Sequence, residues 1–357
     1  MKLARSVILL LSPIALGAQA QSSLNVYGLL DAGVVGERAC DGCASNKVSG
    51  GVASGSRLGL SGREALDGDT AAVFTLEAGV QNDTGRSDQG GLLFGRQAFV
   101  GLDGRLGALT AGRQYNLEYL TLTDVADPFQ GGMAGSAANL IGYSAKRYDN
   151  TIKFATPSLH GVTAAAIYSF GESPYNNDVN RSYGAMLGYA DGPVTLRIAH
   201  QRRNNLLTAT GTTPAVDTSA RNTLVAANVN FGVATAYAGF GCNRGDGRMP
   251  WDPENPYGAL APTSRSTNSS DMLMGLSVPL GAVTVMASFI RKDDHDVGNQ
   301  DANQMALGMT YTMSKRTDVY AAYAKIRNRN GAAYTVGNAT DGGHGDAAFN
   351  LGLRHAF

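Results

Sequence analysis

Seven charged residues in the first half of the chain are spaced so that their charges could act together. The arginines lie in the stretches SGSRLGL, LFGRQAF, TAGRQ and AKRYDN and are Arg57, Arg96, Arg113 and Arg147. The acidic residues all fall in one polar segment, residues 116–146, and are Glu118, Asp124 and Asp127. Arginine stays charged at any working pH, so this set predicts the sorting of ions by charge rather than the making of bonds.

The sequence contains no comparable set for catalysis. None of the five histidines stands on a strand-like stretch beside a persuasive serine, although a serine esterase or phospholipase would need such a pair. A nucleophile elbow, a phosphate-binding glycine loop and a metalloprotease helix signature are also missing. The acidic run DDHD, residues 293–296, lacks the spacing of a calcium loop. We therefore expect neither an enzyme nor a cofactor.

The three cysteines leave two readings open. Cys40 and Cys43 form the pair CDGC, and Cys242 is far away in the sequence. In an exported protein the pair could close a small disulfide loop and leave one thiol over. A structural zinc site would need a fourth ligand, and no histidine stands at a suitable spacing. We expect no metal.

The first twenty residues predict export. Lys2 and Arg5 precede an apolar run over 7–16, and Ala18-Gln19-Ala20 has the small-x-small pattern of a signal peptidase site. The run is much shorter than the roughly 20 residues of a membrane-spanning helix. Without residues 1–20 the formal charge is 27 − 29 = −2, which argues against binding nucleic acid by bulk charge. Residues 21–357 would then form the mature domain.

An alternation of apolar and polar residues recurs along the whole mature chain. In SLNVYGLLDAGVV, Leu24, Val26 and Leu30 share one face, whereas Tyr27 and Asp31 share the other. This period of two predicts strands with one apolar face. A period near 3.6 is suggested only around residues 116–126. We count sixteen such segments of about 8 to 12 residues, a length that suits a tilted strand crossing a bilayer. They begin near residues 23, 56, 71, 93, 108, 147, 161, 183, 193, 222, 233, 271, 282, 303, 317 and 348.

Short and long connections alternate between these segments. LDGD (66–69), ADGP (190–193) and PLG (279–281) are examples of the tight turns, and 116–146 and 242–270 are examples of the long polar stretches. A β-sandwich has no reason to place every long loop at one end, whereas an outer-membrane barrel has short periplasmic turns and long external loops. Because an unpaired backbone group is costly in hydrocarbon, the sheet must close on itself. Sixteen strands leave an aqueous lumen.

The last residues fit a closing strand. In FNLGLRHAF, residues 349–357, the side chains of Phe349, Leu351, Leu353 and Phe357 fall on one side. An even strand number brings both ends of the chain to the same side of the membrane, where the last strand can pair with the first. The apolar side would then face lipid, with Phe357 at the interfacial aromatic girdle.

In order and spacing, several motifs resemble the general diffusion porins of Gram-negative outer membranes, especially the type of Neisseria and related betaproteobacteria. They span the mature chain and include SSLNVYGLLDAGV, SGSRLGLSGREAL, LFGRQAFVGLDGRLGALTAGRQYN, YDNTIKFATPSLHGV and the terminal LGLRHAF. The resemblance implies an all-β, 16-stranded antiparallel transmembrane β-barrel that forms a homotrimer and folds its third external loop inward. It also implies a terminal Phe357 read by the barrel assembly machinery, and surroundings of outer-membrane lipid and lipopolysaccharide.

The resemblance further implies a water-filled channel for ions and small hydrophilic solutes, narrowed where the third loop, 116–146, faces the wall. The four arginines match the cluster that porins place opposite this loop, and the three loop acids would face them. Four bases against three acids favour anions slightly. Inward positions also carry the candidates Asp31, Glu77, Lys153 and Arg197. The alternative is that inward charges merely solvate a wet lumen, because lumen positions are polar by default.

Two rival functions are also compatible with the sequence. A substrate-specific channel would carry a run of aromatic residues along the lumen, and the inward tyrosines such as Tyr27 form no continuous track. An adhesin or receptor would use the barrel only to anchor its long loops, and this role could coexist with transport.

Overall fold

The computed structural model describes residues 22–38, 44–66, 68–172, 178–204, 206–207, 216–217, 219–245 and 266–357. The predicted signal peptide and the Cys40–Cys43 pair lie outside these residues. None of the helices in the described ranges has the length and apolar character needed to cross a membrane.

One antiparallel sheet contains eighteen strands, of which β2 and β5 are short additions and the other sixteen form the wall. The wall strands are β1 (Ser22–Arg38), β3 (Arg57–Ala65), β4 (Ala71–Gln81), β6 (Gln97–Gly104), β7 (Gly107–Tyr115), β8 (Arg147–Ala155), β9 (Val162–Ser169), β10 (Ser182–Asp191), β11 (Val194–Arg203), β14 (Ala220–Asn230), β15 (Thr235–Gly245), β16 (Asn268–Leu280), β17 (Val283–Asp294), β18 (Ala302–Ser314), β19 (Thr317–Asn328) and β20 (Ala347–Ala356). The sixteen expected segments are confirmed. The largest difference is at β6, expected near residue 93 and beginning at Gln97.

The remaining elements are short and lie between wall strands. They are β2 (Ala44–Gly50), β5 (Arg86–Ser87), β12 (Leu206–Leu207), β13 (Val216–Asp217), the α-helix α1 (Leu117–Thr121), the π-helix η2 (Leu122–Ala126) and the 3-10 turns η1 (Gln89–Gly91) and η3 (Ala137–Asn139). The period of 3.6 suspected near residues 116–126 therefore corresponds to α1 and η2.

The sheet closes into a barrel because the last strand pairs with the first. β20 runs antiparallel to β1 from Leu29↔Ala356 to Arg38↔Ala347. Beyond β20, the backbone groups of Phe357 and Gly28 exchange two hydrogen bonds of 3.0 and 3.1 Å. The expected closing strand is thus confirmed, and every wall strand has a partner on both sides.

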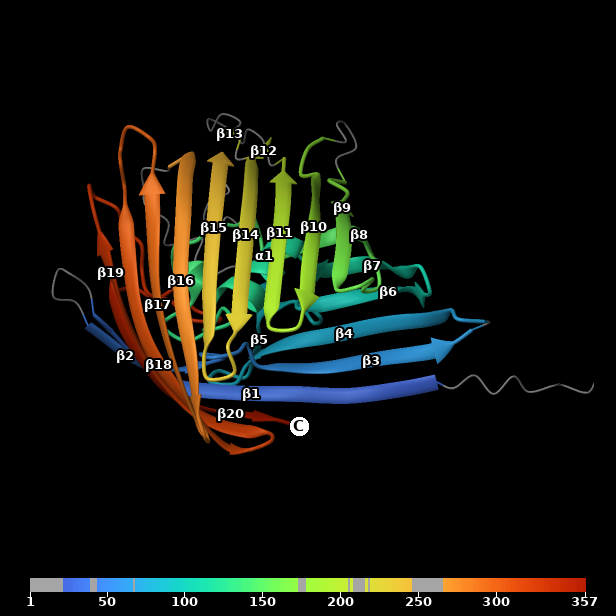
Figure 1. Cartoon of the computed structure of the whole chain (residues 1–357), viewed down its shortest axis with the longest axis horizontal. Helices are drawn as coiled ribbons and strands as arrows, with labels where there is room; N and C mark the ends of the chain where they lie inside the picture. The colour runs from blue at the N-terminus through green and yellow to red at the C-terminus, as the bar shows by residue number, and fades with distance from the viewer. Residues whose placement is uncertain are drawn as a thin grey trace, which may run out of the picture.

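Connections differ between the two ends of the barrel. The hairpin turns such as 192–193 and 281–282 are short and lie at the lower end in Figure 1, whereas the long segments gather at the upper end. One long connection differs from expectation. The segment after β1 is partly ordered as strand β2, which pairs with β1 from Ala32↔Gly50 to Arg38↔Ala44. β1 and β2 thus form a hairpin that begins where the pairing of β1 with β3 ends, at Leu29↔Arg57.

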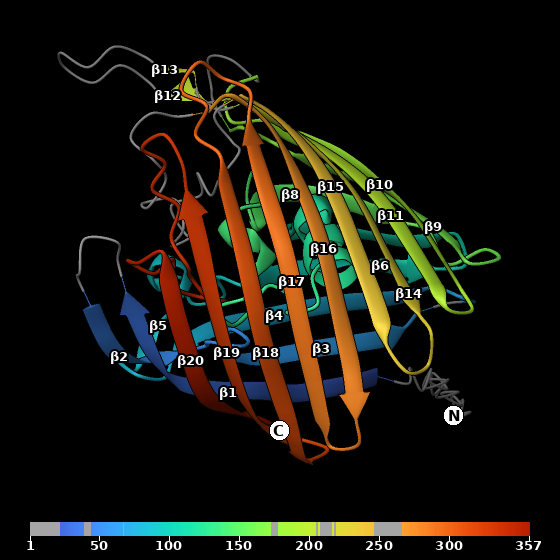
Figure 2. The same cartoon turned by 60° about the vertical axis from the view of Figure 1, so that its left-hand side comes forward.

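The two faces of the wall differ as the alternation predicts. Leu24, Val26 and Phe349 are exposed on the outer face, at 68%, 60% and 46%, while Asp31 on the other face is fully buried. The main apolar core lies inside the barrel, where residues of segment 116–146 such as Phe129 and Ile141 pack with inward residues of the wall such as Leu273 and Ile290. Figure 2 shows the short helices of this segment between the strands in front and those behind.

Candidate functional site

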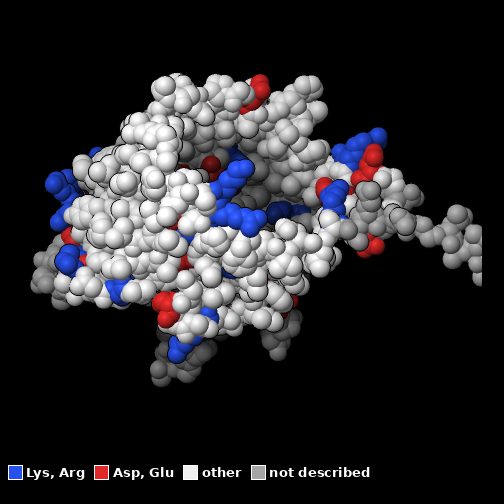
Figure 3. Space-filling view, turned by 90° about the horizontal axis from the view of Figure 1, so that it is seen from below, with Lys and Arg blue, Asp and Glu red and all other residues white. Residues whose placement is uncertain are grey.

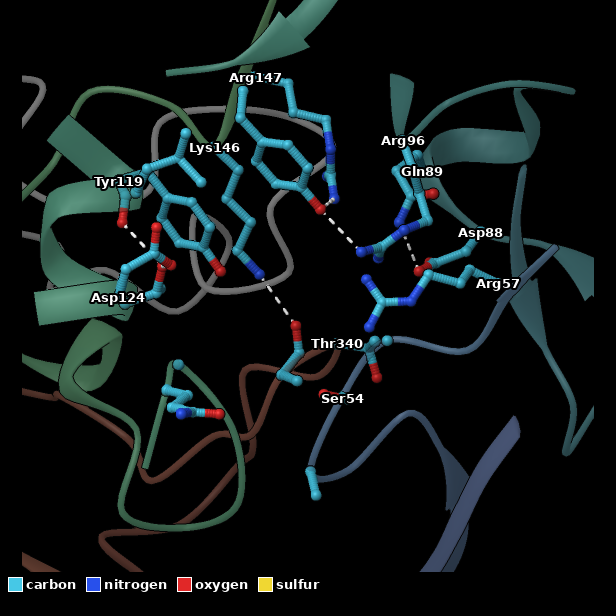
Figure 4. Close-up of a pocket in the computed structure, with 18 residues that line it drawn as sticks. Ser54, Arg57, Asp88, Gln89, Arg96, Tyr119, Asp124, Lys146, Arg147 and Thr340 are labelled. Atoms are coloured by element: carbon cyan, nitrogen blue, oxygen red, sulfur yellow. Dashed lines mark hydrogen bonds between the residues drawn. The ribbon is translucent and has the colours of Figure 1, made fainter. Parts of the chain in front are cut away.

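Charged and tyrosine side chains line one pocket between the wall and segment 116–146. Its lining residues are Ala53, Ser54, Gly55, Arg57, Asp88, Gln89, Arg96, Tyr115, Tyr119, Leu120, Thr123, Asp124, Gln130, Gly131, Lys146, Arg147, Ala339 and Thr340. We call this the charged pocket. In Figure 4, Arg57, Arg96 and Arg147 converge from one side, and Asp124 and Tyr119 lie across from them.

Arg96 is held in place by two partners on neighbouring strands. Its Nε donates to Glu77 Oε1 on β4 at 2.7 Å, and its Nη2 donates to the Tyr115 hydroxyl on β7 at 2.7 Å. Tyr27 on β1 donates to the other Glu77 oxygen at 2.9 Å. Arg96 and Glu77 are only 6% and 4% exposed. The pair therefore fixes the direction of the guanidinium before any solute arrives.

Arg147 and Arg57 complete the basic side. Arg147 also donates to the Tyr115 hydroxyl, and its guanidinium carbon lies 4.2 Å from the centre of the Tyr115 ring, a cation–π contact. Arg57, on β3, is half-buried, and its side chain forms no hydrogen bond or ion pair with another described residue. Arg57 thus has donors that can turn towards a solute.

Segment 116–146 begins with a capped helical turn. Asn116 Oδ1 accepts from the backbone N–H of Glu118 at 2.9 Å, the usual role of an N-cap residue. Tyr119 on α1 then stacks on Tyr115, with ring centres 6.0 Å apart.

Further along, a Cβ atom on Gly132 would lie only 1.9 Å from the Ala53 carbonyl oxygen. Only glycine allows this close approach of two backbones.

Hydrogen bonds tie the segment to distant parts of the wall. Asn139 Nδ2 donates to Gln304 Oε1 on β18 at 2.8 Å, and the Gly142 N–H donates to Asp271 Oδ2 on β16 at 2.7 Å. The Met133 N–H donates to the Val52 carbonyl at 2.8 Å. These contacts hold the segment against β16, β18 and the connection between β2 and β3, so that it forms one wall of the charged pocket.

The three acidic residues of the segment have different surroundings. Asp124 lines the pocket, with its side chain 52% exposed and 3.5 Å from Arg197 Nη1. Asp127 is buried and accepts three backbone hydrogen bonds, from Phe129, Gly131 and Ala137 at 2.8 to 2.9 Å. Burial raises the pKa of Asp127 to about 6, against those hydrogen bonds. Asp127 therefore folds the segment rather than facing the pocket.

Glu118 is also away from the pocket lining. Its side chain is 1% exposed on α1, and burial raises the pKa of Glu118 well above its usual range. A buried carboxyl group that resists ionisation contributes little fixed negative charge to the pocket.

The structure thus brings together Arg57, Arg96, Arg147 and Asp124 from the predicted set. Arg113 is not among the lining residues. Its Nε donates to the Gly95 carbonyl and its Nη1 pairs with Asp149, at 2.7 and 2.6 Å. The register of β7 against β8 shifts between Gly112 and Gln114, which marks a β-bulge. A bulge changes the direction of the neighbouring side chains, so a strict alternation along the strand does not place Arg113 correctly.

The other predicted inward residues serve the surrounding structure. Asp31 accepts the backbone N–H groups of residues 52, 53 and 54 at 2.8 to 3.2 Å and so shapes the turn beside the pocket. Arg197 donates to the Leu120 carbonyl at 3.3 Å and thus joins β11 to segment 116–146. Lys153 lies 6.0 Å from the Phe99 ring centre.

Four further charged or tyrosine residues of the lining went unnoticed in the sequence. They are Tyr115, Tyr119, Asp88 and Lys146. Lys146 donates to the Ala339 carbonyl at 2.9 Å and lies 5.7 Å from the Tyr119 ring centre. Tyr115 could have been found from TAGRQYN, because it lies two residues after Arg113 and the alternation that predicts Arg113 to face inward predicts the same for Tyr115. Asp88 lies in a long connection, where a carboxylate carries no signal of its own.

The lining carries more positive than negative charge. Four cations (Arg57, Arg96, Lys146, Arg147) stand against two acids (Asp88, Asp124), a formal surplus of 4 − 2 = +2. Figure 3 shows Lys and Arg side chains gathered around a hollow in the molecule. The arrangement can attract and orient an anion, and neither a histidine nor a cysteine is among the lining residues.

Comparisons with known proteins agree with this geometry. The model of a family described as Gram-negative porin matches residues 6–331. An outer membrane porin protein of Bordetella pertussis is 32% identical, with 98% of each chain covered. A solved anion-selective porin from Comamonas acidovorans has a TM-score of 0.77 at 25% identity, covering 94% of this chain and all of its own. A Vibrio cholerae outer membrane protein solved in a trimer form has a TM-score of 0.67 at 13% identity, covering 94% and 99%, and shows likeness of fold alone.

Proposed function

Because the chain belongs to the Gram-negative porin family, whose members are outer-membrane channels and not enzymes, we propose that its charged pocket is the constriction of the channel. The narrowing would lie between segment 116–146 and the arginines of the wall. Ions and small hydrophilic solutes would diffuse past it, and anions would pass more readily than cations of the same size.

The surplus of cations over acids in the pocket lining is the observation that carries this proposal. The positive side is preorganised, because Arg96 is fixed by Glu77 and Tyr115, and Arg147 by Tyr115. Groups already oriented towards a passing charge need no costly rearrangement when it arrives. The likeness to the Comamonas acidovorans protein, which is described as an anion-selective porin, supports the same direction.

The preference should be modest. Two unit charges about 10 Å apart interact by ~0.4 kcal/mol in a medium with the dielectric constant of water and by ~1.7 kcal/mol at an effective value of 20. Such energies bias the passage of ions without excluding either sign. They also weaken as salt screens the charges, so the preference should fall as ionic strength rises.

Liposome swelling tests the proposal with solutes of matched size. Liposomes containing the purified protein would be diluted into a neutral sugar, its carboxylate form or its amino form. We expect swelling to be fastest with the carboxylate and slowest with the amine, and the difference to shrink at high salt. No swelling with any solute would refute the channel, and equal rates for all three would refute the selective constriction.

We also propose that three copies assemble, with the short turns on the periplasmic side and the long segments outside. Membership of the porin family and the likeness of fold to the Vibrio cholerae trimer support the trimer. Residues 1–20 would be removed during export. Phe357, at the end of the closing strand, would be recognised by the barrel assembly machinery. Outer-membrane lipid and lipopolysaccharide would surround the apolar outer face.

A further inference from the structure

Three arginines form one row across neighbouring strands on the outer face of the barrel. The registers place Arg202 of β11 opposite Arg221 of β14, and Arg221 opposite Arg244 of β15. All three side chains are exposed. Each lies near the end of its strand that leads into a long segment, the upper end in Figure 1, where these strands stand side by side. We call them the arginine row.

Such a row is unfavourable unless something neutralises it. Side chains directly opposite on paired strands have Cβ atoms about 4.5–5.5 Å apart, and like charges there repel. Within the described part of the chain, no carboxylate pairs with these arginines. Their hydrogen bonds there run from Arg202 Nε to Asn204 Oδ1 at 3.1 Å and from Arg244 Nη1 to the Asn243 carbonyl at 3.3 Å. Because each guanidinium has five N–H donors, most of these donors have no partner among the described residues and can bind a ligand.

Neighbouring side chains show at what depth the row lies in the membrane. The register continues from Arg202 to Tyr183 on β10, and from Tyr183 to Tyr168 on β9. Tyr168 packs edge-on against Phe170, with ring centres 4.9 Å apart. Outward aromatic residues of this kind mark the boundary between hydrocarbon and headgroups in outer-membrane barrels. The arginine row therefore lies at headgroup depth, where outward cations are tolerated.

The wall beneath the row is apolar and grooved. On each of the three strands, the residue four positions from the arginine in the direction of the short turns is apolar and faces outward. These residues are Ile198, Val225 and Phe240, and they are 43%, 47% and 50% exposed. Beside them, small alanine side chains at 164, 166 and 185 leave an apolar groove bordered by Phe154 and Leu187. A ligand of the arginine row would thus need anionic groups above and acyl chains below.

We propose that the arginine row binds the phosphate groups of a lipopolysaccharide molecule in the outer leaflet. The fork of a guanidinium matches phosphate oxygens and can bind them with two parallel hydrogen bonds. A lipid with several phosphates and several acyl chains suits three cations in line above a grooved apolar wall. This inference rests on the proposed orientation, in which the long segments lie outside. It assigns a lipid site that is separate from the charged pocket.

Native mass spectrometry of delipidated protein in detergent would test the site. The variant Arg202→Gln/Arg221→Gln/Arg244→Gln removes the row. The matched control Arg105→Gln/Lys315→Gln/Arg316→Gln removes the same charge from exposed cations in the short turns at the other end. The probes are phosphorylated lipopolysaccharide, the same lipid without its phosphates, and phosphatidylglycerol.

We expect the row variant to bind lipopolysaccharide at least about tenfold more weakly than the wild type, because several charge-assisted hydrogen bonds are lost. The control should bind as the wild type does. Wild-type protein should bind the dephosphorylated lipid and phosphatidylglycerol as weakly as the row variant binds lipopolysaccharide. Equal affinity of the row variant and wild type, an equal loss in the control, or equal binding of all three lipids would overturn the site.

Bilayer conductance separates this inference from the proposed function. The row variant should conduct as the wild type does, which also shows that it folds. A wild-type protein that bound lipopolysaccharide but conducted nothing would refute the channel and leave the lipid site standing. If the triple variant did not fold, the three single variants would replace it, each expected to weaken binding about two- to threefold through loss of one of three contacts.

Discussion

At the scale of single residues, the arginines of the charged pocket differ in how firmly they are held. Arg96 is buried in a pair with Glu77 and bonded to Tyr115, whereas Arg57 is half-buried and its side chain has no hydrogen-bond or ion-pair partner among the described residues. The difference predicts that one arginine supports the fold and the other acts mainly on the solute.

Replacing Arg57 should change selectivity and little else. In Arg57→Gln we expect the reversal potential under a salt gradient to move towards zero, because one cation leaves the lining. The free energy of unfolding should stay within about 0.5 kcal/mol of the wild type, because the Arg57 side chain makes no hydrogen bond or ion pair with another described residue. Planar-bilayer recordings and thermal unfolding in detergent measure the two quantities. A large loss of stability with unchanged selectivity would contradict the assignment.

Replacing Arg96 should instead destabilise the barrel. Arg96→Gln leaves the Glu77 carboxylate buried without its charge partner, which typically costs about 3–5 kcal/mol. The double variant Arg96→Gln/Glu77→Gln removes both charges and should recover much of that loss. Thermal unfolding of the single and double variants gives the comparison. The pairing would be unimportant if the double variant were as unstable as the single one.

Asp127 predicts a specific dependence of stability on pH. Its pKa is raised from 3.8 to about 6 in the folded protein, so the folded state holds this proton more tightly than the unfolded state. Its contribution to the free energy of unfolding is therefore greatest below pH ~4 and falls by about 3 kcal/mol as the pH rises through 6.

The variant Asp127→Asn should lack this dependence, because an amide does not titrate in this range. The difference in stability between wild type and variant should therefore decrease from pH 4 to pH 6 and then stay constant. Unfolding measured at several pH values would show it. A difference that grew with pH would mean that the carboxylate is favoured in the folded state, opposite to this account.

At the scale of elements, segment 116–146 depends on a small number of tethers. Gln304 on β18 accepts from Asn139, and its Nε2 donates to the carbonyls of Gly135 and Ser136 at 3.3 Å. The variant Gln304→Leu removes all three bonds and leaves buried groups unsatisfied, at about 1–3 kcal/mol for each such group.

We expect single-channel currents of Gln304→Leu to be noisier and segment 116–146 to be cut more readily by protease. Gln201 offers a matched control, since it is a fully buried glutamine on β11 whose amide donates to Ser182 on the adjacent strand instead of the segment. Gln201→Leu should leave current noise unchanged. Equal noise in both variants would mean that Gln304 has no special role in holding the segment.

Strands were more predictable than the pocket for a physical reason. An outer face in lipid and an inner face in water impose a period of two on every wall strand, and this signal placed all sixteen. The pocket depends on irregular features. The β7 bulge separates Arg113 from the other arginines, and the inner positions of Asp127 and Glu118 follow from how segment 116–146 folds on itself. Neither a period of two nor a period of 3.6 encodes a bulge or the path of such a segment, so the sequence pattern did not place these side chains.

At the scale of the whole molecule, the barrel depends on its closing seam. A Cβ atom on Gly28 would lie 2.2 Å from the Phe357 ring, so the ring covers the glycine where the chain ends meet. Gly28→Val should displace the ring and lower the thermal stability of the assembled barrel.

Phe357→Ala should lower the yield of assembled protein in cells more strongly than it lowers the yield of protein refolded in detergent. Equal losses in both settings would argue against recognition of Phe357 by the assembly machinery.

The reversal potential of the wild-type channel under a potassium chloride gradient tests the central claim most directly. A constriction with a surplus of positive charge should pass chloride more readily than potassium, so the dilute side should become negative. The potential should shrink as total salt rises, because screening weakens the fixed charges. A dilute side that became positive would contradict the assignment of the charged pocket as an anion-preferring constriction.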